Sequence, residues 1–273
     1  MYTVLHELLA DKKGGVIFTC FGFWHFLFLG IFLACAAVLV YYTYNIEEAK
    51  RERVIGTVIT GAFAVYMADF FLMPLAYGQI DIEKLPFHVC TVTCILCLLS
   101  RRNTWLRKYR ISFAAVGFIS NMAYLLFPAG VMWYEIHPLS YRVLQTFLFH
   151  SCMGLYGLLV LLFEAKRDDG KRYIRDLTVV CAIAIWALLG NTVYNASTEE
   201  YDHFFNWFFL MRDPFSMFPE KISPYIMPPL NVTLFFVVER LVHPVAFVLR
   251  KCLGTEENKR RENECTIWKT TPN

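Results

Sequence analysis

The chain has 273 residues, of which 57% are hydrophobic and 17% aromatic, and its mean hydropathy is positive at +0.43. Soluble globular domains are about 45–50% apolar, so this composition excludes an ordinary soluble domain and predicts an integral membrane protein. The net charge of +3 is a weak argument for binding nucleic acid, and we expect no nucleic-acid partner.

Seven apolar segments are candidate membrane-spanning helices. Runs of about 18 or more apolar residues are typical of such helices, and the cost of unpaired backbone groups in hydrocarbon favours helices over open structures. The third segment has only 15 residues and needs help from flanking residues or from local thinning of the bilayer. In chain order the segments are Val16–Tyr44, Val54–Tyr77, Leu85–Leu99, Tyr109–Met132, Tyr141–Phe163, Leu177–Tyr194 and Tyr225–Leu249.

Positive charges alternate between the two sides of these segments. Arg110 and Arg142 lie at the ends of the fourth and fifth segments and are counted with the adjoining loops. The loops after the first, third and fifth segments, together with the C-terminal tail, then hold 19 Lys and Arg residues, whereas the other side holds six. Cytoplasmic loops are enriched in Lys and Arg, so we predict an all-α membrane protein with seven transmembrane helices, the N-terminus outside and the C-terminus in the cytoplasm. It would lie in the plasma membrane of a bacterium or the endoplasmic reticulum of a eukaryote.

One transmembrane domain, residues 1–254, is expected, followed by a tail, residues 255–273, whose polar composition predicts disorder. The nine cysteines are an odd number and lie mostly inside the predicted spans. A thiol there behaves as a small apolar group, so no disulfide framework is predicted.

Polar side chains of all seven predicted helices fall at a common depth. A charge at the bilayer centre costs about 2.5–3.5 kcal/mol on insertion scales, so each ionisable group needs a reason. For the histidines and the aspartate we favour a cavity open to the outer leaflet, whereas Asn121 and Asn231 alone would suggest interhelical hydrogen bonds. The residues at this depth are His25, Asp69, His88, Cys90, Asn121, His150, Asn191, Asn195 and Asn231.

Three further charged or titratable residues lie deeper in the seventh segment, namely Glu239, Arg240 and His243. Glu239 and His243 share a helix face at i, i+4 spacing and can pair with each other. We count Glu239 among the candidate substrate-binding residues.

The stretch "LPFHVCTVTCILC", residues 85–97, carries one histidine and three cysteines. On a helix His88 and Cys90 are about 200° apart, so a His/Cys dyad needs a histidine from another span, and His150 has a compatible depth. A thiol beside an imidazolium is a nucleophile, whereas a thiol in apolar surroundings is inert. Cys94 and Cys97 are expected to pack like alanine. We predict no metal site and no cofactor, because zinc would need paired ligands that this stretch lacks.

Four short motifs, in this order, resemble the YwaF-type family of bacterial integral membrane proteins. They are "FGFWHFLFL" at 21–29, "LPFHVC" at 85–90, "FLFHSC" at 147–152 and "NTVYN" at 191–195, and the resemblance extends from about Phe21 to His243. It points to His25, His88, Cys90, His150, Asn191 and Asn195 as the positions that match the family's motifs.

That family looks related to the mammalian transmembrane protein 164, a cysteine-dependent acyltransferase acting on phospholipids and lysophospholipids. The resemblance implies an acyl-thioester mechanism, with a cysteine of the third span as nucleophile and the histidine of the fifth span as base. Phe87 stands where the mammalian cysteine aligns, and Cys90 lies three residues further on, on nearly the same helix face one turn deeper.

Our leading hypothesis is a membrane lipid acyltransferase or transacylase whose partners are phospholipids and lysophospholipids. Its catalytic residues would be Cys90 and His150, although His150 or His88 acting as a general base without a cysteine nucleophile is an alternative. A transporter or lipid-binding protein that uses the same polar cavity is the second hypothesis. A receptor is the third, supported by analogy of fold alone. The candidate substrate-binding residues are His25, Asp69, His88, Asn191, Asn195 and Glu239.

Overall fold

The structure is a computed structural model that describes residues 7, 9, 15–78, 82–132, 135–164, 171–196, 204–214 and 216–270. Within these residues all regular structure is helical, which confirms the predicted all-α membrane fold. Six helical segments are long and apolar enough to cross a membrane. They are α2 (Phe23–Tyr44), α3 (Glu48–Tyr77), α6 (Arg110–Leu126) taken with α7 (Ala129–Met132), α8 (Tyr141–Glu164), α9 (Lys171–Ala196) and α10 (Ser223–Thr270).

A seventh apolar helix, α4 (Val89–Ser100), has 12 residues, which corresponds to a length of about 18 Å. The hydrocarbon layer is about 30 Å thick, so α4 alone is too short to cross it. The prediction of a short third span is therefore confirmed in position, and the helix is shorter still than predicted. The remaining short elements are η1 (Ile82–Lys84), α5 (Thr104–Arg107) and η2 (Trp207–Phe209).

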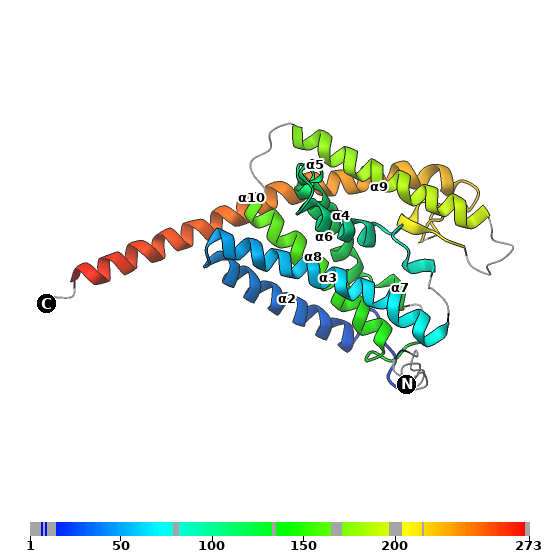
Figure 1. Cartoon of the computed structure of the whole chain (residues 1–273), viewed down its shortest axis with the longest axis horizontal. Helices are drawn as coiled ribbons and strands as arrows, with labels where there is room; N and C mark the ends of the chain where they lie inside the picture. The colour runs from blue at the N-terminus through cyan, green and yellow to red at the C-terminus, as the bar shows by residue number, and fades with distance from the viewer. Residues whose placement is uncertain are drawn as a thin grey trace.

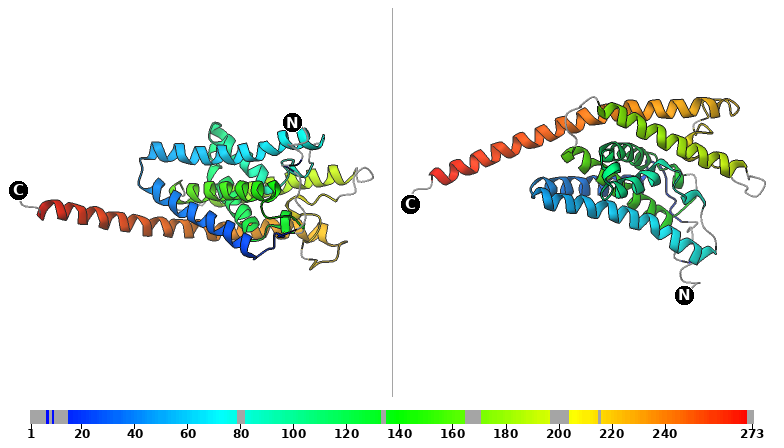
Figure 2. Two further views of the ribbon diagram at one scale, coloured as in Figure 1. Left: turned by 90° about the horizontal axis from the view of Figure 1, so that it is seen from below. Right: turned by 45° about the horizontal axis from the view of Figure 1, so that its top comes forward.

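The centre of the bundle is formed by α4, α6 and α8. Helix α8 packs against both α6 and α3, while α4 packs against α6 and α3, and α9 packs against α10. In Figure 1 and in the right view of Figure 2 the α2–α3 pair lies on one side of this centre and the α9–α10 pair on the other. Large apolar side chains on α2 and α9, such as Phe23, Leu33 and Ile185, are exposed, as expected of helix faces that contact lipid.

Two predicted spans differ from the structure. Residues 16–22 are not helical, and Phe18 of this segment donates its backbone N–H to Ile136 O at 2.8 Å, so the first helix begins at Phe23. The fourth span is interrupted at Pro128, between α6 and α7, because proline lacks an N–H and disfavours a helical residue before it.

Helix α10 continues to Thr270, so the structure extends a helix through the tail for which the composition predicts disorder. Glu, Lys and Arg are good helix formers, and a charged composition does not by itself end a helix. Figure 1 shows the C-terminal part of α10 projecting away from the bundle.

Candidate functional site

The segment that leads into α4 is irregular, and side chains from three other elements hold its backbone. Irregular backbone is tolerated at membrane depth where it is buried in protein or lines a cavity. The backbone carbonyls of Glu83, Lys84 and Pro86 accept hydrogen bonds from aromatic side chains. Tyr66 Oη donates to Lys84 O at 2.8 Å, Trp186 Nε1 to Pro86 O at 2.7 Å and Trp207 Nε1 to Glu83 O at 3.4 Å.

Asp69 of α3 pairs with Lys84 at the end of η1. The Lys84 Nζ lies 3.1 Å from Asp69 Oδ2, and the Tyr141 hydroxyl donates to Asp69 Oδ1 at 2.7 Å. The Asp69 side chain is 2% exposed and that of Lys84 is 28% exposed. The carboxylate therefore fixes an ammonium group that is itself partly accessible.

His150 of α8 is held by Asn121 of α6, with 2.6 Å between His150 Nδ1 and Asn121 Oδ1. The Asn121 amide nitrogen donates to Gly117 O at 2.6 Å, so the amide oxygen is the atom that faces the imidazole. Because an amide oxygen only accepts, His150 Nδ1 carries the proton. The hydrogen bond to Asn121 is the one that the His150 ring makes in the described part of the chain, so in the neutral ring Nε2 is an available base.

Two neighbours surround this pair. The Tyr124 ring stacks on the His150 ring, with centroids 3.8 Å apart and planes 10° apart. Ser120 lies near the Cys90 thiol, and its hydroxyl oxygen is 3.4 Å from the Asn121 amide nitrogen. Ser120 and Asn121 are thus neighbours of Cys90 and His150 respectively, and no direct hydrogen bond joins the two predicted catalytic residues among the described contacts.

Cys90 is the second residue of α4, and His88 is the N-cap residue. The His88 side chain makes no capping hydrogen bond. In the described part of the chain no backbone carbonyl accepts from the N–H groups of Val89 and Thr91 in the first turn either. The start of a helix carries a partial positive charge from such groups. A developing negative charge on a ligand or on the thiol is favoured at this position.

These residues form one group, which we call the polar cluster. Lys84 and His88 both lie close enough to His150 to interact with it electrostatically, so the Asp69–Lys84 pair and the Cys90–His150 group belong together. Of the sequence-predicted site residues, Asp69, His88, Cys90 and His150 are brought together here. The polar cluster consists of Asp69, Lys84, His88, Cys90, Ser120, Asn121, Tyr124, Tyr141 and His150.

His25 lies at the start of α2 in a different environment. Its Nδ1 accepts from the Phe21 N–H at 2.9 Å, and its Nε2–H donates to Leu125 O at 2.8 Å. The ring is fully buried and both nitrogens are used by backbone groups. The structure therefore shows His25 joining α2 to the end of α6, and its predicted contact with substrate stays a prediction.

Asn191 and Asn195 of α9 hold the segment around η2. Each side chain donates to a backbone carbonyl and accepts from the N–H of the same residue, Asn191 with Trp207 and Asn195 with Phe205, at 2.8–3.0 Å. A third asparagine, Asn231 of α10, donates to Phe209 O at 3.0 Å. We call these three residues the asparagine clamps.

The clamped segment is strained and covers the approach to α4. Phe208 and Phe209 have φ values of 60° and 52°, a conformation that costs a non-glycine residue about 1–3 kcal/mol. The Trp207 ring packs on Phe87, with 4.8 Å between centroids, directly before the N-cap of α4. Asn191 and Asn195 thus act on the site through this covering segment in the structure, and a direct role in substrate binding stays a prediction.

Glu239 is not part of the polar cluster. It is fully buried on α10, near Asp176 of α9 and His243 of α10. The predicted proximity of Glu239 and His243 is present, and Asp176 is the member that sequence spacing did not indicate.

Four members of the polar cluster were not among the sequence-predicted residues. Ser120, Tyr124 and Tyr141 carry hydroxyl groups that are cheap to place in a span, so depth alone does not single them out. Lys84 lies in a loop, where a lysine is ordinary. The one available signal is that Ser120 and Tyr124 flank Asn121 within one helical turn.

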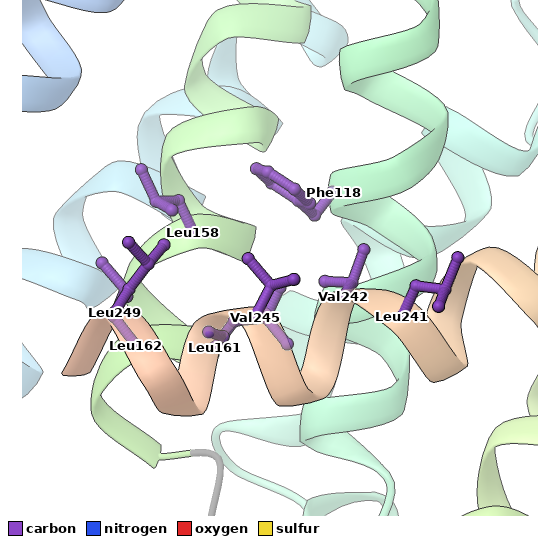
Figure 3. Close-up of a pocket in the computed structure, with 9 residues that line it drawn as sticks. Phe118, Leu158, Leu161, Leu162, Leu241, Val242, Val245 and Leu249 are labelled. Atoms are coloured by element: carbon purple, nitrogen blue, oxygen red, sulfur yellow. The ribbon is translucent and has the colours of Figure 1, made fainter. Parts of the chain in front are cut away.

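A groove lined only by apolar side chains lies where α10 crosses α6 and α8 (Figure 3). Phe118, Leu158 and Val245 are among its lining residues. Leu158 is eight residues beyond His150 on α8, about 12 Å along the helix axis. The groove has no polar or titratable residue in its lining, and this lining suits contact with a hydrocarbon chain.

The fold and the site define a multi-pass membrane protein with a buried polar cluster at one end of the helix bundle. The sequence profile of the TMEM164 family matches residues 20–247, and the chain belongs to the TMEM164 family. No curated protein matches the chain, and no solved structure matches it.

Proposed function

We propose that this protein is a membrane lipid acyltransferase or transacylase that moves a fatty acyl chain between a phospholipid and a lysophospholipid. Cys90 is the nucleophile and His150 is the general base. The observation that most supports the proposal is the hydrogen bond from His150 Nδ1 to Asn121 Oδ1, because it leaves Nε2 free to accept a proton. An orienting partner on the base is typical of nucleophilic catalysis.

In the first step His150 Nε2 takes the proton from the Cys90 thiol, and the thiolate attacks the ester carbonyl carbon of a phospholipid. The tetrahedral oxyanion is stabilised by the free N–H groups at the start of α4. The ester C–O bond then breaks, and the proton on His150 passes to the leaving alkoxide. A lysophospholipid departs, and the acyl chain stays on Cys90 as a thioester.

In the second step His150 accepts the proton of a hydroxyl group on another lysophospholipid. The resulting oxygen nucleophile attacks the thioester carbonyl, the C–S bond breaks, and the proton returns from His150 to the Cys90 sulfur. No oxidant, reductant or nucleotide is consumed, which agrees with the predicted independence from a cofactor.

Cys90 and His150 must come into direct contact for the first step, because no hydrogen bond joins them among the described contacts. Catalytic hydrogen bonds are often long or absent without substrate and tighten in the reacting complex. We propose that the Cys90 side chain rotates away from Ser120 to bring its thiol to His150 Nε2.

Lys84 is the residue we propose for contact with the lipid phosphate. Its ammonium group is partly exposed, is held by buried Asp69 and lies near His150. A fixed cation at the edge of the polar cluster suits an anionic head group, while the acyl chain would extend along apolar helix faces.

The test is an acyl-transfer assay on purified protein in nanodiscs that contain acyl-labelled phospholipid and unlabelled lysophospholipid. We expect transfer by the wild type and by Cys94→Ala, a buried thiol one turn away on the same face of α4. Transfer should fall by at least about 100-fold in Cys90→Ala and in His150→Ala, as expected when a nucleophile or general base is lost.

Transfer that persists in both the Cys90 and His150 variants would end the proposed dyad. Loss in the His150 variant alone would indicate base catalysis without a cysteine nucleophile. No transfer by the wild type, combined with uptake of lipid or protons into liposomes, would favour the transporter hypothesis instead.

A further inference from the structure

Asp176, Glu239 and His243 form a second buried group, which we call the acidic–histidine cluster. One ligand atom from each residue lies within 4.8 Å of the other two. Asp176 and Glu239 are completely buried, and His243 is 8% exposed. Asp176 precedes Asn191 by 15 residues on α9, about 22 Å along the helix axis, so this cluster is remote from the segment that covers the polar cluster.

The Glu239 carboxyl is buried without a hydrogen-bond partner in the described part of the chain. Neither of its oxygens makes a hydrogen bond in the described chain, and the group that it approaches is the Asp176 carboxyl, which is also an acceptor when ionised. Arg172 and Arg240 are near enough to interact with Glu239 electrostatically. The Arg240 guanidinium, however, lies over the Tyr173 ring, 5.0 Å from its centroid. Burying a carboxylate without a hydrogen-bonded partner costs several kcal/mol, so a cation bound directly between the two carboxyl groups would stabilise the cluster.

The donor set fits a metal ion. We propose that Asp176, Glu239 and His243 bind one divalent transition-metal ion, for which Zn²⁺ is the natural probe. Two carboxylates and one imidazole are ligands that such ions accept, and the imidazole disfavours Mg²⁺ and Ca²⁺. This site departs from the expectation, drawn from the sequence around Cys90, that the protein has no metal site.

The spacing of the donors is close to that of a metal site. Ligands at about 2.0–2.1 Å from a tetrahedral zinc ion are roughly 3.4 Å from each other, and His243 Nε2 lies 3.3 Å from Asp176 Oδ2. A Glu239 oxygen completes a set of three donor atoms that lie within 4.8 Å of one another. The Ser112 hydroxyl of α6 donates to Asp176 Oδ1 at 2.5 Å, the kind of outer contact that orients a ligating carboxylate.

An ion at this position would join α9 to α10, which lie side by side in Figure 1, and through Ser112 would also fix α6. It would neutralise two buried carboxylates within a pair of membrane-spanning helices. The site does not depend on the acyl-transfer proposal, because none of its members belongs to the polar cluster.

The experiment measures metal content of the full chain, produced in medium supplemented with Zn²⁺ and purified into nanodiscs without chelator. We expect about one zinc per chain in the wild type. Occupancy should fall roughly tenfold or more in Glu239→Gln and in His243→Gln. His137→Gln is the matched control, because His137 is a half-buried histidine outside both clusters.

Two further measurements separate this site from adventitious binding by the cysteines. Protein loaded with Co²⁺ should show ligand-field bands without a thiolate charge-transfer band. Chelation should lower the melting temperature of the wild type and of His137→Gln, and should leave that of the two ligand variants unchanged. Asp176→Asn replaces either ligand variant that does not fold.

Wild-type protein with less than about a tenth of a zinc ion per chain would overturn the proposal. So would zinc that is retained equally in the folded ligand variants, or a Co²⁺ spectrum dominated by thiolate. In those cases the two carboxyl groups share a proton instead of a metal ion.

Discussion

The Asn121 amide has one orientation in the structure, because its nitrogen must donate to Gly117 O and its oxygen is then the only atom left for His150. This single constraint decides which imidazole nitrogen carries the proton. A buried asparagine between two helices commonly makes a structural hydrogen bond. Asn121 makes such a bond between α6 and α8, and it is also the partner of the proposed base.

Asn121→Ala should lower the rate of acyl transfer in a protein that still folds. A buried hydrogen bond whose partner is removed costs about 1–3 kcal/mol, which corresponds to roughly 5- to 150-fold in rate. The effect should appear in kcat with little change in KM, because the His150 ring loses its orientation while the lipid contacts remain. Kinetics in nanodiscs measure this separation.

The control for that measurement is Ser151→Ala. Ser151 follows His150 in the chain and makes no hydrogen bond in the part of the chain that the structure describes. An equal loss of activity in both variants would show that any perturbation of α8 is damaging, and would remove the special role of Asn121.

How much of the site can be predicted at this scale depends on the cost of each side chain in the membrane. Asp69, His88 and His150 are expensive there, so depth along the predicted spans singles them out, and the structure brings them together. The hydroxyl groups of Tyr124 and Ser120 cost little free energy in the membrane, so the depth argument does not indicate these two residues. His25 lies at the same depth, but both of its nitrogens bind backbone groups in the structure, so its contact with substrate stays a prediction.

Among the elements, α6 and α8 carry the two residues of the His150–Asn121 pair, and their separation sets its geometry. Gly157 makes the close approach possible. A Cβ atom at this position would lie 2.6 Å from Phe118 Cβ and 2.8 Å from Ala114 O, and these are atoms that cannot turn away.

Gly157→Ala should therefore destabilise the protein by about 1–3 kcal/mol, the usual cost of overpacking, and lower its melting temperature in nanodiscs by several degrees. Gly30→Ala on α2 is the matched control, since nothing lies within 4 Å of its added Cβ. Alanine favours a helix by up to about 1 kcal/mol over glycine, so Gly30→Ala should be neutral or stabilising. A melting temperature unchanged by Gly157→Ala would contradict the close packing.

The asparagine clamps make a second prediction at the level of elements. Asn191→Ala removes both hydrogen bonds to the Trp207 backbone and releases a strained turn. Hydrogen exchange of residues 204–210 should become faster by roughly 5-fold or more for a loss of about 1 kcal/mol or more, while exchange in α6 and α8 stays unchanged.

Thr192→Val serves as the control for the clamp, because the Thr192 hydroxyl donates only to Leu188 O within its own helix. Exchange that is as slow in Asn191→Ala as in Thr192→Val would show that the covering segment does not depend on the clamp.

Helix positions follow from apolar runs and are largely predictable, but their interruptions depend on local backbone chemistry. Pro128 ends α6 by removing an N–H, which a hydropathy pattern averages away. The irregular approach to α4 is held by indole and phenol donors from α3, α9 and η2. These are contacts between segments far apart in the sequence, so no local pattern reports them.

At the scale of the whole molecule, the sidedness of the bundle is still a prediction. The alternation of Lys and Arg predicts that the turn between α2 and α3 and the turn containing α5 face the cytoplasm, while the segment containing η2 faces outward. Single cysteines at Glu47, Asn103 and Glu220, introduced one at a time, would be tested in intact cells with a membrane-impermeant maleimide.

We expect labelling at residue 220 alone in intact cells, and labelling at all three positions after the membrane is permeabilised. The natural cysteines are replaced by serine or alanine in this experiment, because several of them, among them Cys20, Cys35 and Cys252, are not buried. Labelling of residue 47 or 103 in intact cells would contradict the predicted orientation.

Which helices become neighbours is the part that the sequence leaves open. The 200° separation of His88 and Cys90 shows that a partner histidine must come from another helix, and depth then suggests His150. It does not reveal that Ser120 and Asn121 of α6 are neighbours of the two proposed catalytic residues. Asp176 likewise joins Glu239 and His243 only because α9 packs against α10.

The proposed mechanism requires that the acyl chain spends part of each cycle on the Cys90 sulfur. The most direct measurement is mass spectrometry of protein incubated with labelled phospholipid in nanodiscs and quenched before a lysophospholipid acceptor is added. If Cys90 carries the acyl chain, the protein should bear one acyl group per chain, labile to hydroxylamine, on the peptide that contains Cys90, and none in His150→Ala. An active wild-type protein without this thioester, or with its acyl group on another residue, would contradict the proposed mechanism.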